Sequence, residues 1–191
     1  KVDLDVNLFP SQGDYVSSGT LTLRNTSTRP IDDVFLGVDP DASDVTLDFG
    51  GGSENVFRYP DLGVQIHSLK QAMAPGAETT LRFRIARTRE GFPDGAPSLD
   101  VVANGSFLTM PVPSIGYQEG AEIADDSERR RQGLAKKAQM GDPKDPKSRL
   151  SSYLGKDADW VRFACTVRTE PGQTAVAPGY LEKQWNEDGK A

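Results

Sequence analysis

The sequence has few of the side chains from which hydrolytic and metal sites are usually built. Its 191 residues include one histidine, His67, and one cysteine, Cys165. Zinc hydrolases use two or three imidazoles, and a Ser-His-Asp triad would need His67 beside a nucleophile. A single cysteine can form neither an internal disulfide nor a cysteine-built zinc site. The sequence therefore predicts no catalytic residues, no metal ligands and no cofactor in this chain.

Positive charge and long apolar runs are also scarce. Lys and Arg number 22 against 28 Asp and Glu, which gives a formal net charge of -6. We therefore expect no nucleic-acid partner, since such proteins usually carry a basic face. No apolar run approaches the ~20 residues that cross a bilayer, so we expect the chain itself to be soluble. Because it begins with Lys1 and not with methionine, we expect it to be a fragment of a longer protein.

Alternating apolar residues predict that the first half of the chain is β-structure. Val2, Leu4, Val6 and Leu8 share one face of a predicted strand, and the polar residues between them share the other. The connections are too short for the crossovers that parallel strands need. We predict one mainly β domain over residues 1–191, an antiparallel β-sandwich or a saddle-like curved sheet with one short helix. The other predicted strands lie at 20–24, 34–38, 45–49, 64–69, 81–85, 161–167, 173–177 and 180–185.

A short helix and a long basic loop are predicted in the second half. Asp125 or Asp126 can cap a helix over Ser127–Leu134, because a carboxylate accepts hydrogen bonds from the free amides of a first turn. Residues 135–158 lack any sustained period and predict a long irregular loop. The stretch 129–149 holds eight Lys or Arg residues. It is a solvated loop, or it contacts anionic lipid or an acidic partner domain.

Three single features each have an ordinary structural interpretation. The parity of His67 places it opposite Val64 and Ile66, as expected of an exposed or hydrogen-bonded strand histidine. Cys165 has the parity of an apolar face and predicts a buried, inert thiol. The glycines at 50–52 lack the Lys-Ser/Thr pair of a phosphate-binding loop, so they predict a hairpin loop.

An ordered series of motifs resembles one peptidase family. The chain is similar over nearly its whole length to the amino-terminal domain of the aminopeptidase N family of zinc metallopeptidases. It looks most like the bacterial branch in which that peptidase unit is fused behind an ABC-transporter permease. The motifs are Ile115-Gly116-Tyr117, Asp125-Asp126-x-Glu128-Arg129-Arg130, Trp160-Val161-Arg162-Phe163 and Ala177-Pro178-Gly179-Tyr180-Leu181.

The resemblance implies a non-catalytic domain in front of a catalytic one. Such a saddle-like domain covers the active-site cleft, helps to position the peptide amino terminus, and has the downstream catalytic domain of the same chain as its partner. The zinc, its His-Glu-x-x-His motif and the bound peptide substrate would belong to that domain, so the parent would be the aminopeptidase. Gln118 or Glu119 is the residue that would contact the substrate. The family branch also implies a domain of a membrane-anchored bacterial protein, outside the cytoplasm.

A second hypothesis remains open. The chain could instead be an independent β-sandwich binding or sensor module with no peptidase attached. The two hypotheses differ in the sequence expected after Ala191, since only the first requires a His-Glu-x-x-His motif within the next few hundred residues.

Overall fold

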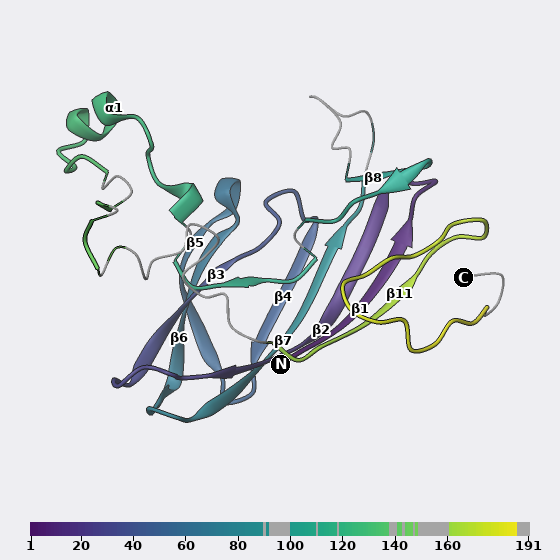
Figure 1. Ribbon diagram of the computed structural model, residues 1–191, viewed down its shortest axis with the longest axis horizontal. Coiled ribbons are helices and arrows are strands. Elements are labelled where there is room, and N and C mark those ends of the chain that lie inside the picture. The colour runs from purple at the N-terminus through teal and green to yellow at the C-terminus, as the bar shows by residue number, and fades with distance from the viewer. Residues whose placement is uncertain are drawn as a thin grey trace. The chain divides into compact units, whose positions relative to one another are not determined.

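The structure is a computed structural model that describes residues 1–89, 91, 100–109, 111–117, 119–137, 141–142, 144–146, 148 and 161–186. The chain divides into two units. The first contains Lys1–Gln118 and Arg162–Ala191, and the second contains Glu119–Val161. All strands of the described residues lie in the first unit (Figure 1).

A five-stranded sheet forms one layer of the first unit, in the order β11-β1-β2-β7-β4. The neighbouring strands among β1, β2, β7 and β4 pair antiparallel. The edge strand β11 runs parallel to β1. Arg168 of β11 donates from Nη1 to both carboxylate oxygens of Asp5, each at 2.6 Å, which fastens the edge strand to β1. The strands are β1 (Val2–Phe9), β2 (Asp14–Arg24), β4 (Asp44–Phe49), β7 (Glu78–Arg87) and β11 (Phe163–Arg168).

A four-stranded antiparallel sheet forms the other layer, in the order β10-β3-β6-β5. A small third sheet pairs β8 (Val101–Val102) with β9 (Gly105–Ser106). A single 3-10 turn, η1 (Pro60–Leu62), connects β5 to β6. The strands of the second layer are β3 (Ile31–Gly37), β5 (Ser53–Tyr59), β6 (Val64–Met73) and β10 (Ser114–Ile115).

The core lies between the two layers and is built from the alternation seen in the sequence. Leu4 and Val6 of β1 are buried, as are the three apolar residues that alternate along β7. Each contributes about 1.5–3 kcal/mol by leaving water, which favours this stacking of the sheets. The mainly β, sandwich-type fold is therefore confirmed. The buried cluster consists of Leu4, Val6, Tyr15, Leu21, Val34, Leu36, Val38, Phe49, Leu81, Phe83, Ile85 and Val101.

Three predictions about elements of the first unit were wrong. The glycines at 50–52 do not close a hairpin, because β4 belongs to the five-stranded sheet and β5 to the four-stranded one. The turn carries the chain from one layer to the other, and Gly52 adopts φ 78° there. Residues 173–177 and 180–185 form no strands. Nearly all of their side chains are exposed, Val176 to 89% and Tyr180 to 100%, so little packing is available to support a strand.

The second unit contains a short helix with the predicted cap. Helix α1 spans Asp126–Arg131 and follows the 3-10 turn η2 (Glu119–Ala121). The Asp125 carboxylate accepts from the amides of Ser127 and Glu128, each at 2.9 Å. The hydrogen bond from the Ser127 hydroxyl, followed by the one from the Glu128 amide, lowers the pKa of Asp125. Most of the predicted loop at 135–158 lies outside the described residues. In the described part of the chain, no helix has the length and apolar character that a bilayer-spanning helix needs.

Candidate functional site

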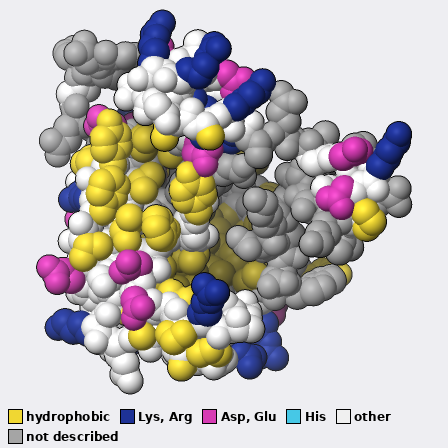
Figure 2. Space-filling model, turned by 90° about the vertical axis from the view of Figure 1, so that its left-hand side faces the viewer, with side chains coloured by type: hydrophobic (Ala, Val, Ile, Leu, Met, Phe, Trp, Pro, Cys, Tyr) yellow, Lys and Arg dark blue, Asp and Glu magenta, His cyan; other side chains and the backbone are white. Residues whose placement is uncertain are grey.

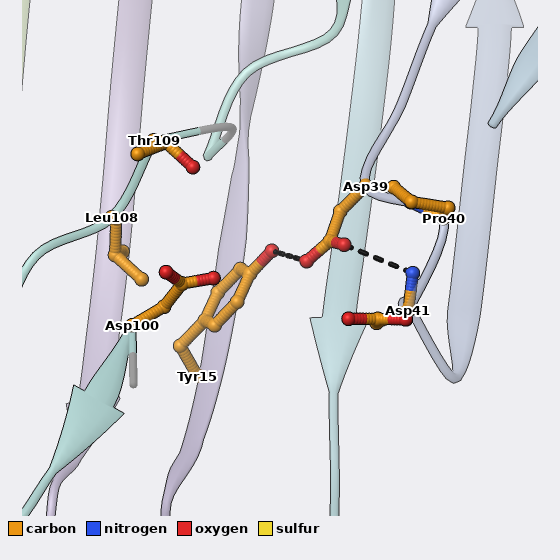
Figure 3. Close-up of a pocket in the computed structure, with 7 residues that line it drawn as sticks. All are labelled: Tyr15, Asp39, Pro40, Asp41, Asp100, Leu108 and Thr109. Atoms are coloured by element: carbon orange, nitrogen blue, oxygen red, sulfur yellow. Dashed lines mark hydrogen bonds between the residues drawn. The ribbon is translucent and has the colours of Figure 1, made fainter. Parts of the chain in front are cut away.

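Arg87, the last residue of β7, is buried among three carboxylates. Its Nη1 atom lies 3.0 Å from Asp100 Oδ2 and 3.4 Å from Asp39 Oδ2, and its Nη2 atom contacts Asp41 Oδ2. Tyr15 of β2 lies directly opposite Arg87 in the sheet and donates its hydroxyl hydrogen to Asp39 Oδ2 at 2.7 Å (Figure 3). This group, the Arg87 cluster, therefore joins the five-stranded sheet to the segment between β3 and β4.

The local sequence Asp39-Pro40-Asp41 explains how two of the carboxylates come together. The amide of Asp41 donates to Asp39 Oδ1 at 2.9 Å, and the amide of Ala42 donates to the Asp39 carbonyl oxygen at 3.1 Å. Asp and Pro both favour such tight turns, the first by accepting from the backbone and the second by its fixed φ. The turn thus presents Asp39 and Asp41 to the same guanidinium.

A cavity of about 200 Å³ opens beside the cluster. Burial, followed by the hydrogen bond to Asp39, raises the pKa of Tyr15 well above its usual value of 10.0. The Tyr15 hydroxyl therefore stays protonated near neutral pH, where it acts as a hydrogen-bond donor and not as an acid. The arrangement can hold strands together and accept polar hydrogens, but it lacks an activated nucleophile. The cavity is lined by Tyr15, Asp39, Pro40, Asp41, Asp100, Leu108 and Thr109 (Figure 3).

His67 lies beside a serine inside the second layer. Its Nδ1 atom is 3.1 Å from Ser53 Oγ, and its Nε2 atom is 3.3 Å from Gln65 Oε1, which also accepts from Asn55 Nδ2 at 2.9 Å. His67 is 6% exposed, and burial lowers its pKa. The partner at Nε2 is a neutral amide and not a carboxylate, so it offers no charge to stabilise an imidazolium. The prediction of a hydrogen-bonded strand histidine is confirmed, and the group is structural.

The side chains of the two predicted substrate-contacting residues are not among those that the structure describes. Gln118 lies outside the described residues. Glu119 begins η2 in the second unit, and only its backbone is described. Both assignments stay predictions.

The remaining reactive side chain gives no sign of activation. Cys165 on β11 is only partly buried, and burial followed by the charge of Asp5 raises the pKa of its thiol. A raised pKa leaves little thiolate near pH 7, which agrees with the predicted inert thiol. In the part of the chain that the structure describes, no group of three or more His, Cys, Asp or Glu residues could hold a metal ion.

The Arg87 cluster was not found from the sequence. Its members are separated by up to 85 positions, between Tyr15 and Asp100, and no short motif contains them. A signal did exist, because Arg87 ends the apolar alternation of β7 and Asp39-Pro40-Asp41 marks a turn. The sequence did not show that β2 pairs with β7, and this pairing is what places Tyr15 opposite Arg87.

The fold and its polar groups define a β-sandwich domain in which the buried guanidinium of Arg87 forms ion pairs with carboxylates of the same domain. No protein-family model matches the chain, and no curated protein matches it. Among solved structures, the chain is similar to M1 zinc metallopeptidases from Deinococcus radiodurans. One, a mutant bound to a Tyr-Ser-Ala substrate, is 16% identical with a TM-score of 0.45, and the match covers 99% of this chain and 36% of that one. Another is 22% identical with a TM-score of 0.36 and covers 51% of this chain and 21% of that one. The chain thus spans between a fifth and about a third of their length.

Proposed function

We propose that the chain is the non-catalytic amino-terminal domain of a zinc aminopeptidase-like protein. In this account a downstream domain of the same protein holds zinc and hydrolyses the peptide, while this chain covers the cleft. The observation that carries the proposal is the ordered series of motifs that resembles the aminopeptidase N family. The two-sheet fold is compatible with it.

The motifs have structural roles that suit a domain of fixed shape. Gly116, in Ile115-Gly116-Tyr117, adopts φ 102° and donates its amide hydrogen to the Phe35 carbonyl oxygen at 2.8 Å. A residue with a side chain would be strained at this φ, so glycine is required. The motif that begins at Asp125 caps and forms α1. These motifs therefore determine backbone geometry, which supports a positioning role and not a chemical one.

The finer points of the proposal concern where the parent protein resides and how substrate is held. We propose a bacterial parent anchored in the membrane through a fused ABC-transporter permease, with this domain outside the cytoplasm. We also propose that Gln118 or Glu119 reaches the free amino group of the bound peptide. An amide or carboxylate oxygen suits that role because it accepts hydrogen bonds from an ammonium group.

The coding sequence and the kinetics of one variant test this proposal. The sequence after Ala191 should contain a His-Glu-x-x-His motif, and its absence would favour the independent binding module. In the longer protein, Gln118→Ala should raise KM or lower kcat for peptides with a free amino terminus, without lowering the melting temperature. Gln12→Ala, an exposed position in the β1–β2 turn, is the matched control and should change neither. Unchanged kinetics in Gln118→Ala would remove Gln118 from the site.

A further inference from the structure

The edge strand β11 contributes less to the core than the other strands of its sheet. Each of the other four strands buries at least one apolar residue in the core cluster, whereas Cys165 and Val167 of β11 only pack partly against it. The first two residues of β11, Phe163 and Ala164, are exposed, Phe163 to 40%. The hydrophobic effect therefore holds β11 in place only weakly.

The other strands of the sheet are paired without β11. Strand β1 pairs with β2 along its whole length, from Val2 to Phe9, so it keeps a neighbour when β11 is absent. Strand β11 lies at the edge, next to β1, and pairs with it in parallel, which is the less stable of the two kinds of pairing (Figure 1). Release of β11 thus breaks one ladder and leaves the antiparallel strands and the core in place.

The last residue of β11 and the two that follow it are fastened by side chains. Arg168 donates to both carboxylate oxygens of Asp5, and the next residue, Thr169, is 4% exposed. Glu170 then accepts from the Ser11 hydroxyl at 2.6 Å and from the Ser11 amide at 3.2 Å. These contacts hold the end of β11 to β1 and to the turn between β1 and β2.

The start of β11 is held more weakly, and it is the end at which the chain returns from the second unit. That unit comprises Glu119–Val161, so its last residue lies two positions before Phe163. At this end the Val2 amide donates to the Arg162 carbonyl oxygen at 2.8 Å, while the side chains of Val161 and Phe163 are 56% and 40% exposed. A displacement of the second unit therefore pulls on the weakly held end of the strand.

We propose that β11 is a releasable strap that peels from β1 beginning at Phe163 and stays held at Arg168, while the rest of the sandwich remains folded. The peeled residues, 163–167, then join the chain that leads to the second unit, and at about 3.3–3.6 Å per residue they span roughly 17 Å. Release of the strap therefore lengthens the tether between the second unit and the five-stranded sheet. The proposal concerns contacts within the first unit, so it is independent of the proposed function.

Amide hydrogen exchange of the folded chain, followed by NMR at increasing urea below the unfolding transition, tests the strap. The β11 amides that donate to β1 should exchange through an opening that hardly depends on urea, because peeling a short edge strand exposes little surface. Amides that join β2 to β7 should exchange roughly a hundredfold or more slowly, with the steep urea dependence of global unfolding. Along β11, exchange should slow from the Phe163 end to the Arg168 end.

Three variants separate peeling of β11 from unfolding of the whole domain. Arg168→Met should speed the exchange of β11 by about two- to five-fold, the effect of one partly exposed ion pair. Arg82→Met is its matched control, because the ion pair of Arg82 with Asp48 lies at the opposite edge of the sheet and remains intact when β11 peels. Val45→Ala removes a partly buried side chain of the other edge strand, β4. It should speed the exchange of the β2–β7 amides and leave that of β11 unchanged.

The other outcomes overturn the proposal. If Val45→Ala speeds β11 as much as it speeds the β2–β7 amides, β11 opens only when the whole domain unfolds. Exchange of β11 in the parent chain at the rate of an unstructured peptide would show that no strap is held closed. Slower exchange at the Phe163 end than at the Arg168 end would reverse the direction of peeling and refute the anchor at Arg168.

Discussion

Tyr15 and Arg87 lie directly opposite each other on β2 and β7, and both reach the same oxygen, Oδ2 of Asp39. Tyr15 is 2% exposed, Arg87 7% and Asp39 8%. If either partner were removed, little water could reach the Asp39 carboxylate to replace it. An unpaired charge in such a place costs several kcal/mol. The sandwich therefore depends on both side chains being present together.

Removal of the guanidinium should destabilise the domain strongly. Arg87→Met keeps much of the side-chain volume but leaves Asp39 buried without its cation. We expect a loss of about 3–5 kcal/mol in the free energy of unfolding. Chemical denaturation monitored by circular dichroism measures this loss.

The matched control is Arg84→Met on the same strand. Arg84 pairs with Asp44 at 2.5 Å, but the two side chains are 47% and 56% exposed. Exposed ion pairs contribute about 0–1 kcal/mol, so this variant should remain close to the parent in stability. Equal losses in the two variants would show that burial of the Arg87 cluster does not matter.

The pH dependence of stability should report the burial of His67. Burial lowers the pKa of His67 below its ordinary value of 6.5. As the pH falls through 6.5, the unfolded chain takes up a proton on this imidazole before the folded chain does. The unfolded state is then favoured, so the free energy of unfolding should decrease between pH 7 and pH values below 6.5.

The chain offers a clean control because His67 is its only histidine. His67→Gln removes the titrating group and retains a side chain that can hydrogen-bond to Ser53. Its unfolding free energy should be nearly flat between about pH 7 and 6, a range below the α-amino pKa and above those of ordinary carboxyl groups. The same slope in parent and variant would contradict the burial of the imidazole.

Substitution of Gly63 should disrupt the link between η1 and β6. Gly63 adopts φ +63°, and a Cβ atom there would lie 2.0 Å from the carbonyl oxygen of Val38. We expect Gly63→Ala to lose about 1–3 kcal/mol from the backbone conformation alone, with the clash adding to it. Gly51→Ala is the control, because a Cβ atom there meets nothing within 4 Å. Thermal denaturation of the two variants should separate them clearly, and similar melting temperatures would show that the turn can rearrange.

The strands that could be predicted are those whose two faces differ in polarity. β1 and β7 bury alternate apolar residues, and this alternation is plain in the sequence. β5 was missed because its residues from Glu54 to Tyr59 are all exposed and a bulge between Asn55 and Phe57 interrupts the period. In β6 two polar residues, Gln65 and His67, are buried, whereas the apolar residues beside them lie on the outer face. Gln65 and His67 point inward because Asn55 and Ser53 hydrogen-bond to them, so Val64 and Ile66 point outward.

Neither the Arg87 cluster nor the apolar outer face of the four-stranded sheet, where Figure 2 shows hydrophobic side chains gathered, has a signature in the linear sequence. Both depend on the order of strands in the two sheets, which sets Tyr15 opposite Arg87 and Phe35 beside Ile66. Local alternation predicts that a strand exists but not which strand it pairs with. By contrast, the cap of α1 at Asp125 involves only residues within three positions and was predicted correctly.

Metal content and peptidase activity measured side by side test the central claim most directly. The chain and the longer protein proposed to contain it would each be purified, and zinc determined by mass spectrometry together with hydrolysis of an amino-acid amide substrate. The account predicts one zinc ion per molecule and zinc-dependent hydrolysis in the longer protein, with neither in the chain alone. Stoichiometric zinc or hydrolysis in the chain alone, or their absence from the longer protein, would contradict it.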